Sequence, residues 1–368
     1  MMTDSSTFAP DWISPPGDTI EDLLAERGWS KAEFAERTGF TAKHVNELVK
    51  GRVPITADAA ERLSRVLGST SDFWLVRDAQ YQAARERQRA IKSAVEDADW
   101  LSELPLAWMR KQGWVPRRRD KGEQVLECLS YFGVASVPAW REQYAAPVTA
   151  FRASETHEKR IGAIAAWLRK GEIKTSKIEC ETFDKSRLRA SLAEIRSLTI
   201  EPDPSVFVPR LVNTCASNGV SLAFVPAPTG CPVSGATRWL TPNKAMLLLS
   251  MRHKSNDHLW FTVFHEIAHL LLHGKRMFFI EGIKGLDPAL EREADVFASE
   301  TLISADDARR LKEIAKPNVA KAKIIQFAEE IGIAPGVVVG RMQKEIWIPW
   351  SHLNALKTRY VWANEPEN

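Results

Sequence analysis

The sequence predicts a mainly α-helical fold with one small β-sheet, and three stretches carry this prediction. Residues 30–50 have the pattern of two short helices separated by a glycine, and residues 101–200 carry several amphipathic helix patterns. Residues 260–273 follow short strand patterns and form a helix pattern that is apolar nearly all round. We therefore expect a helical bundle, a helical middle region and an α+β domain, in that order.

The expected domain boundaries follow changes in composition and pattern. We expect a flexible tail at 1–16, a helix-turn-helix domain at 17–85, a helical connector or scaffold at 86–204, an α+β domain at 205–346 and a tail at 347–368. The first segment is rich in proline and small polar residues, which is typical of a flexible lead-in.

Capping residues mark the first helices. Capping-box spacing occurs at two pairs, Asp18 with Glu21 and Ser30 with Glu33. Gly28 and Gly39 stand where helices would end in a left-handed residue.

Ala35, Gly39, Val45 and Leu48 fall at the spacing of a helix-turn-helix motif. The alanine lets two helices approach, the glycine permits the turn, and the other two residues anchor the second helix in the core. A plain helical hairpin shares some of these requirements, so the pattern favours DNA binding without requiring it.

The second helix of this motif, 41–50, would be the recognition helix in the major groove. Six residues are candidate DNA contacts: Thr41, Lys43, Asn46, Glu47, Lys50 and Arg52. Thr41 can cap the helix near a phosphate, Lys43 can bind a guanine edge, and Glu47 can accept from cytosine. Lys50 and Arg52 are expected to hold phosphates, although each polar residue alone is equally typical of a solvated surface.

The middle region is expected to contain helices at 122–132, 138–144, 155–170 and 185–198, with a further helix at 205–218. Strands are expected at 220–226, 233–240 and 245–250. Near the C-terminus, Ala328, Gly332 and Val338 repeat the four-then-six spacing, but Pro335 and neighbouring valines favour a packing hairpin over a second helix-turn-helix.

The helix at 260–273 contains His265, Glu266 and His269 in H-E-x-x-H order. Histidines four residues apart lie on one helix face, so both imidazoles can bind one metal ion. Glu266 beside them can take a proton from a water molecule that the metal activates. The alternative is a core helix whose histidines are satisfied by neighbours, but burying two imidazoles and a carboxylate unpaired costs several kcal/mol.

A third ligand is expected from the helix at 287–302, with Asp287 as its N-cap. On a helical wheel, Glu291 lies about 60° from the centre of the inward stripe and Glu293 about 100°. Glu291 is therefore the better ligand, and Asp295 one turn later could orient a ligand histidine. His273 is expected to lie behind the ligands or near the helix end, although a fourth ligand there would close the site.

Residues 220–346 resemble the ImmA/IrrE family of bacterial metallopeptidases. The resemblance rests on Val233–Gly235, Lys244–Ser250, Phe261–His273 and Glu291–Ile303. It implies a zincin-like α+β domain and zinc-dependent cleavage of a transcriptional repressor. Members of the family usually have Asn at the place of Asp295 and commonly Gly at that of Ala268.

Residues 17–85 resemble the HigA branch of XRE-type repressors through Gly51–Leu63 and Ser71–Tyr81. That resemblance implies a homodimer on a palindromic double-stranded operator and, in many members, a toxin partner. The text around Phe151 and Trp167 also resembles regulators in which these two modules are fused.

The composition limits where DNA could bind and where the protein acts. The net charge is only +3, so any DNA contact must be local. No signal peptide, membrane-spanning run or C-x-x-C spacing is present, so we expect a cytoplasmic protein with free, buried cysteines at 128, 180, 215 and 231.

Three functions remain open from the sequence. The first is a DNA-binding regulator whose zinc endopeptidase cleaves a repressor, either a partner or its own connector near 82–100. The second is a non-enzymatic antitoxin-type repressor, in which the peptidase-like domain serves sensing or dimerisation. The third is a soluble peptidase whose N-terminal domain binds only protein.

Overall fold

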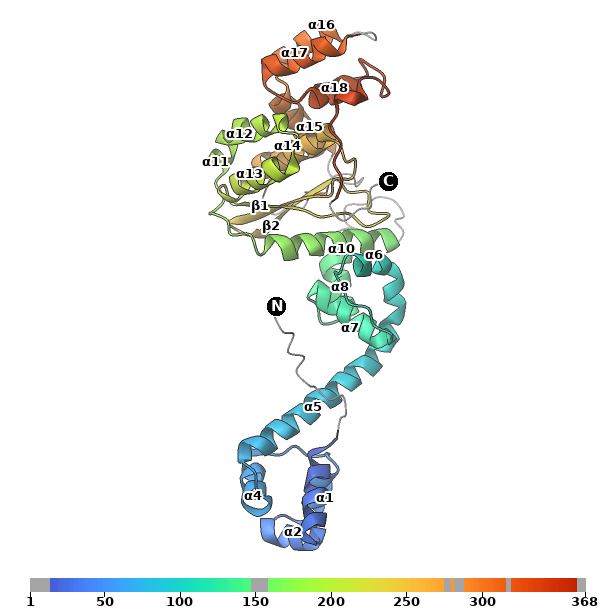
Figure 1. Ribbon diagram of the computed structural model, residues 1–368, viewed down its shortest axis with the longest axis vertical. Coiled ribbons are helices and arrows are strands. Elements are labelled where there is room, and N and C mark those ends of the chain that lie inside the picture. Colours follow the sequence, from blue (N-terminus) through green and yellow to red (C-terminus); the bar gives the residue numbers. More distant parts are fainter. Residues whose placement is uncertain (1–13, 147–157, 275–278, 281–287, 316–318, 363–368) are drawn as a thin grey trace, which may run out of the picture. The chain divides into compact units, whose positions relative to one another are not determined.

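The computed structural model describes residues 14–146, 158–274, 279–280, 288–315 and 319–362 (Figure 1). It is mainly helical with one small sheet, so the predicted fold class is confirmed. The chain divides into two compact units, one of residues up to 98 with 120–126, the other of residues 99–119 and 127 onward. No helix in the described residues is both long and apolar enough to cross a membrane.

Five helices of the first unit share one apolar core. They are α1 (Pro16–Arg27), α2 (Lys31–Thr38), α3 (Ala42–Val49), α4 (Ala57–Leu67) and α5 (Ser71–Ala94). Phe34, Val45 and Trp74 are completely buried in this core. Asp78 of α5 accepts a hydrogen bond from the backbone N–H of Ile55 at 3.1 Å, which ties the loop before α4 to the long helix.

Most of the predicted caps of this bundle are confirmed. Ser30 accepts from the N–H of Glu33, and both Gly28 and Gly39 are left-handed at helix ends. The expected capping box at Asp18 is wrong, because α1 begins earlier, at Pro16, after Pro15. Proline already has the backbone angle of a first helical turn, so the two prolines start the helix without a side-chain cap.

The described part of the middle of the chain is mainly helical, as predicted, and residues 155–157 of the helix predicted at 155–170 lie outside it. Its helices are α6 (Leu106–Lys111), α7 (Lys121–Phe132), α8 (Val137–Trp140), a π-helical turn (Arg141–Ala145) and α10 (Glu158–Thr175), and a 3-10 segment (Val95–Glu103) precedes them. The single helix expected at 185–198 is instead α11 (Lys185–Ala190) and α12 (Leu192–Ser197), broken at Ser191. Residues 198–200 then form a 3-10 turn before α13 (Pro204–Ala216).

A four-stranded sheet carries the second unit, in the order β1-β3-β2-β4. β1 (Val220–Phe224) is parallel to β3 (Lys244–Leu249), and β2 (Gly235–Thr241) is antiparallel to β3 and to β4 (Phe279–Ile280). The first three were predicted within a few residues, while the two-residue β4 was not.

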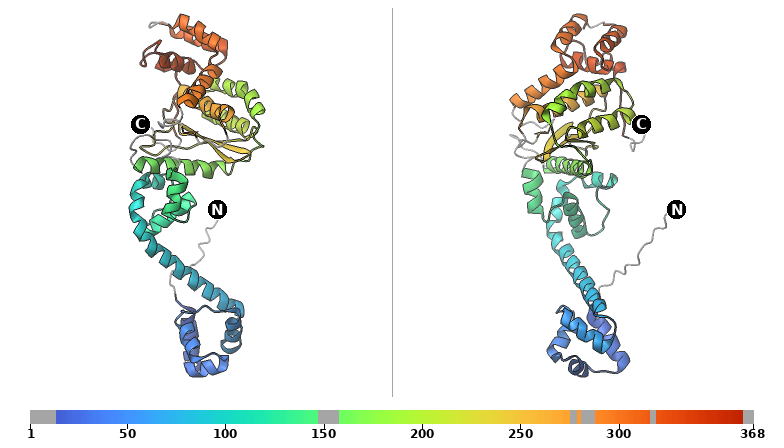
Figure 2. Two further views of the ribbon diagram at one scale, coloured as in Figure 1. Left: turned by 180° about the vertical axis from the view of Figure 1, so that it is seen from behind. Right: turned by 90° about the vertical axis from the view of Figure 1, so that its left-hand side faces the viewer.

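Helices cover both faces of this sheet (Figure 2), and alternate residues of its strands pack on the two sides. Leu222, Leu247 and Leu249 join the core under α13 and α14 (Asn256–Leu272), whereas Ala223 and Leu248 pack against α10. The same alternation in β2 turns Gly235 and Thr237 towards α14. Two layers of helices thus enclose the sheet, with the histidine helix against its centre.

Two of the remaining helices pack directly on α14. α15 (Pro288–Leu302) and α18 (Pro335–Lys344) pack on it, and α16 (Ala305–Ile314) and α17 (Lys321–Ile331) complete the unit. The predicted cap Asp287 lies outside the described residues. Ala328 and Val338 of the hairpin of α17 and α18 are fully buried in the core that contains α14. Because the matching positions of the first motif are buried too, the packing hairpin stays a prediction.

The residues after α18 fold back onto the start of α14. The carbonyl of Thr358 accepts from the N–H of Asn256, and Lys357 donates to Asp257 at 2.6 Å. Tyr360 is buried in the same core. All four cysteines are free; Cys180 is half-buried and the other three are buried.

Candidate functional site

α14 places the H-E-x-x-H residues in the interior. His265 and His269 are 2% exposed and Glu266 is fully buried, although the rest of the helix is mostly aliphatic and aromatic. Polar side chains at such a depth are stable only with partners, since an unpaired buried polar group costs several kcal/mol. The structure supplies these partners from α15 and β2.

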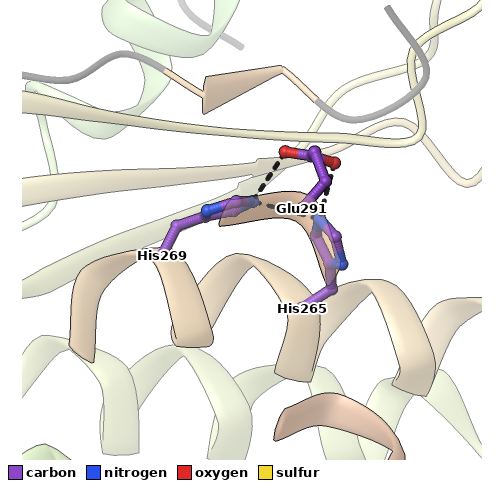
Figure 3. Close-up of side chains that lie close together, drawn as sticks. All are labelled: His265, His269 and Glu291. Atoms are coloured by element: carbon purple, nitrogen blue, oxygen red, sulfur yellow. Dashed lines mark hydrogen bonds and ion pairs between the residues drawn. The ribbon is translucent and has the colours of Figure 1, made fainter. Parts of the chain in front are cut away.

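Glu291 of α15 lies between the two histidines, and the three side chains point toward one another (Figure 3). Its carboxylate oxygens are 3.5 Å from His265 Nε2 and 3.3 Å from His269 Nε2. The two Nε2 atoms are 3.0 Å apart. The side chains expected to form the metal site are therefore brought together by the packing of α14 on α15.

Asp295 engages the other nitrogen of His265. Its Oδ1 lies 3.0 Å from His265 Nδ1, and the side chain is 48% exposed. Because a carboxylate only accepts, Nδ1 carries the proton and Nε2 presents its lone pair to the cluster. This fixes both the tautomer and the ring orientation that a metal ligand needs.

His269 is supported in a different way, through a second histidine. Its Nδ1 lies 2.8 Å from Nδ1 of His273, the residue that follows the last turn of α14. His273 Nε2 in turn lies 3.4 Å from a carboxylate oxygen of Glu293. His273 is thus located behind the ligand cluster and not within it.

The electrostatics of the cluster favour a neutral imidazole at His269 and an ionised carboxylate at Glu291. Burial lowers the pKa of His269 below its ordinary value, against an opposing hydrogen bond with Glu291. Burial raises the pKa of Glu291, but its interactions with both histidines outweigh it and bring the pKa to about 2. The carboxylate of Glu291 is therefore anionic at neutral pH.

Glu266 is held against the sheet by β2. The hydroxyl of Thr237 donates to its carboxylate. Gly235 leaves the necessary room, because a Cβ there would come within 2.5 Å of Glu266 Oε1. The carboxylate is therefore fixed beside the histidine pair by one hydroxyl and by the absence of one side chain.

These donors suit zinc. One ligand atom from each of His265, His269 and Glu291 lies within 4.8 Å of the other two. Bond lengths of roughly 2.0–2.1 Å at tetrahedral angles require ligand atoms about 3.3 Å apart. The two Nε2 atoms are 3.0 Å apart, and each lies near that distance from a different oxygen of Glu291, His269 Nε2 at 3.3 Å from one and His265 Nε2 at 3.5 Å from the other. Two imidazoles and one carboxylate are also a ligand set of catalytic zinc sites, which leave the fourth position open.

The six residues predicted to contact DNA surround α3 in the first unit. Lys43, Asn46 and Lys50 are exposed, while Thr41 accepts from the N–H of His44 and so caps the helix. Glu47 forms an ion pair with the exposed Arg52 at 3.3 Å. In the free protein these two charges therefore compensate each other.

Two residues around the candidate ligand cluster were missed from the sequence, and the contact of a third, Glu293, was not predicted. Thr237 and Gly235 could have been found from strand alternation, since residues two apart in β2 share the face that meets α14. The contact of Glu293 with His273 had no such signal, because it depends on how α15 packs on α14.

Comparison with known protein families finds a match for the N-terminal helical bundle and another for the domain that contains α14. The helix-turn-helix family matches residues 20–74, and the IrrE N-terminal-like domain of the M78 peptidases matches residues 233–342. The chain therefore carries a helix-turn-helix domain and an IrrE/ImmA-like domain of a metallopeptidase family.

A curated relative is also similar to this chain. It is YddM, an uncharacterized HTH-type transcriptional regulator of Escherichia coli (strain K12), with 35% identity over 60 residues. The match covers 16% of this chain and 64% of that protein.

Proposed function

We propose that this protein is a DNA-binding regulator and a zinc-dependent endopeptidase that cleaves a repressor protein. The convergence of His265, His269 and Glu291 next to the buried Glu266 carries the proposal. A purely structural metal site would need no buried carboxylate beside its ligands. Here the carboxylate of Glu266 lies beside the ligands and is held in place by the hydroxyl of Thr237.

The side chains divide the chemistry among them. Zinc, when bound, polarises the peptide carbonyl and makes a nearby water molecule more acidic. Glu266 accepts the proton of that water and then donates it to the leaving amine. Asp295 keeps His265 in the tautomer that presents Nε2 to the metal, and Thr237 keeps Glu266 in position.

The helix-turn-helix domain supports DNA binding by α3. Its exposed Lys43 and Asn46 are suited to base edges, and Lys50 to a phosphate. We propose that Arg52 exchanges Glu47 for a phosphate on binding, which frees Glu47 to accept from a cytosine. A homodimer on a palindromic operator remains part of the proposal.

A partner repressor is favoured as substrate over this chain's own connector. A peptidase binds its substrate extended, whereas residues 82–94 belong to the continuous helix α5 and would have to unwind first. A toxin partner, as in antitoxins of the HigA branch, stays a separate prediction with no surface assigned to it.

Metal content tests the site without knowledge of the substrate. Elemental analysis of the purified chain should give about one zinc per chain, and His265→Ala should lose it. Glu266→Gln should retain zinc, because this residue is not a ligand in the proposal. A wild-type chain that binds no zinc even when zinc is supplied would contradict the proposed site.

Substrate cleavage is tested by sequencing new protein N-termini in cells. Cells with the wild-type chain should show at least one N-terminus that is absent from cells with Glu266→Gln, since a general base typically contributes a factor of about 10²–10⁴. A new terminus within residues 82–100 would identify self-cleavage. Identical termini in both strains under every inducing condition would favour the non-enzymatic repressor.

A further inference from the structure

A cavity of about 320 Å³ lies at the beginning of α14, apart from the three metal-ligand candidates. Its walls come from the loop between β3 and α14, the first turns of α14, the end of α15 and α18. Nothing in the chemistry proposed above uses it.

The cavity is lined by an excess of positive charge. Arg252, Arg341 and Lys344 contribute cations. Among the lining residues the acidic one is Asp257, and its carboxylate already accepts from Lys357 at 2.6 Å. The interior of the cavity is therefore electropositive, which favours an anionic ligand.

Arg341 lines this wall with a guanidinium group that is only partly paired. Its Nη2 pairs with Glu345 at 3.1 Å, and its Nε is buried and has no hydrogen-bond partner among the described residues. A carboxylate bound in the cavity would pair with the charge of this guanidinium group.

The loop that carries Arg252 is held in an unusual conformation. Met251 and Lys254 have positive φ values of 55° and 52°, and residues other than glycine rarely adopt this backbone conformation. Arg252 itself donates to the carbonyl of Pro232 at 2.6 Å. Such strain is concentrated at ligand-binding sites, where the surrounding structure maintains it.

The cavity lies on the same face of α14 as the metal-ligand candidates. His258, Phe261 and His265 are successive residues of that face, and the rings of Phe261 and His265 are 6.0 Å apart. His258 precedes His265 by seven residues, or about 10 Å along the helix. An extended peptide covers that distance with about three residues.

We propose that this cavity is a carboxylate-binding subsite that takes an Asp or Glu side chain of the protein substrate, about three residues from the cleaved bond. The identity of the occupant as a substrate side chain depends on the proposed peptidase function. The preference for a carboxylate depends only on the cavity. Arg341 and Lys344 are the specificity-determining residues, with Arg252 holding the wall.

Binding is tested with N-acetyl-glutamate N-methylamide and its glutamine analogue, titrated into the full chain without zinc. Histidine ring signals of His253 and His258 report on occupancy by NMR. The acid should bind at least 10-fold more tightly than the amide. Equal binding of both probes, or binding of neither, would overturn the subsite.

Variants locate the binding in this cavity. Arg341→Gln and Lys344→Gln should each weaken binding of the acid probe about 10-fold. Lys312→Gln, at an exposed position on α16, should change its affinity less than twofold. Lys344 is exposed, so its variant tests the cavity even if Arg341→Gln is destabilised. An unchanged affinity in Lys344→Gln would contradict the assignment.

The source of the carboxylate is tested with the zinc-loaded chain and a proteome-derived peptide library. Cut sites should be enriched in Asp or Glu about three residues away, and Lys344→Gln should lose this enrichment. Cleavage without enrichment, with the acid probe still bound, would overturn the substrate side chain as occupant and leave a small free carboxylate. If no peptide is cut, the proposed peptidase function fails, while the binding experiment still decides the subsite.

Discussion

The two candidate functional regions of this chain place their side chains in opposite environments. Lys43, Asn46 and Lys50 are exposed on α3, whereas His265 and Glu266 are nearly or completely buried on α14. An exposed charge interacts weakly with its neighbours and is readily replaced, but a buried polar group depends on each partner. Substitutions in the metal cluster should therefore have large effects, and those on α3 small, additive ones.

Gly235→Ala should give the largest effect and is the strongest test of this contrast. The new Cβ would overlap Glu266 Oε1 and the methyl group of Thr262, at 2.5 and 2.7 Å. Overpacking of this kind typically destabilises by roughly 1–3 kcal/mol. Urea unfolding should report it, together with loss of proteolysis.

Gly274→Ala is the matched control, since a Cβ there meets nothing within 4 Å. Equal stability of the two variants would mean that Glu266 moves freely, and the contrast between rigid and adaptable regions would fail.

Asp295→Ala should lower zinc affinity by about 10–100-fold, the usual consequence of losing a partner behind a ligand histidine. Glu293→Gln should have a smaller effect, because it reaches His269 only through His273 at 3.4 Å. Glu300→Gln, on an exposed part of α15, should have none. Competition with a zinc chelator measures all three, and a Glu300 variant as weak as the Asp295 variant would contradict the proposed support.

The sequence predicted the central parts of both regions for a physical reason. Periodicity within one helix fixes neighbours, so His265 and His269 were paired by spacing, and Gly39 and Thr41 by their capping roles. Contacts between elements are decided by tertiary packing. The wheel could rank Glu291 above Glu293, but nothing local pointed to the contact of Glu293 with His273.

The cavity at α14 shows the same limit. Arg252 and Arg341 are far apart in the sequence and meet only because α18 packs on α14. The first element of the bundle illustrates a local error instead, since Pro15 and Pro16 started α1 before the expected cap at Asp18.

The stability of the metal-free chain should fall as the pH drops below about 6.5, the ordinary pKa of histidine. Burial lowers the folded-state pKa of His253, His258 and His269, so protonation favours the unfolded chain, which binds more protons in this range. Glu291 contributes little to this change, because its folded-state pKa of about 2 and the ordinary pKa of an unfolded Glu both lie below this pH range. Urea unfolding between pH 7.5 and 5 should show the loss, with a shallower slope in His269→Gln. An identical dependence of stability on pH in the variant and the wild type would show that His269 does not contribute to it.

The smallest effects are expected on α3. Lys43→Ala and Lys50→Ala should each weaken operator binding, and a residue that holds a phosphate should lower the slope of log affinity against log salt by about 1. Lys50→Ala should therefore change the salt slope, whereas Lys43→Ala should change base preference with a nearly unchanged slope. Neither should alter zinc content or the unfolding midpoint, because both side chains are exposed.

Lys92→Ala, far along α5, is the control for a general loss of charge. If both α3 variants bound DNA as wild type with the same salt dependence, the helix-turn-helix domain would have to bind a protein, and the exposed surface of α3 would need a different partner.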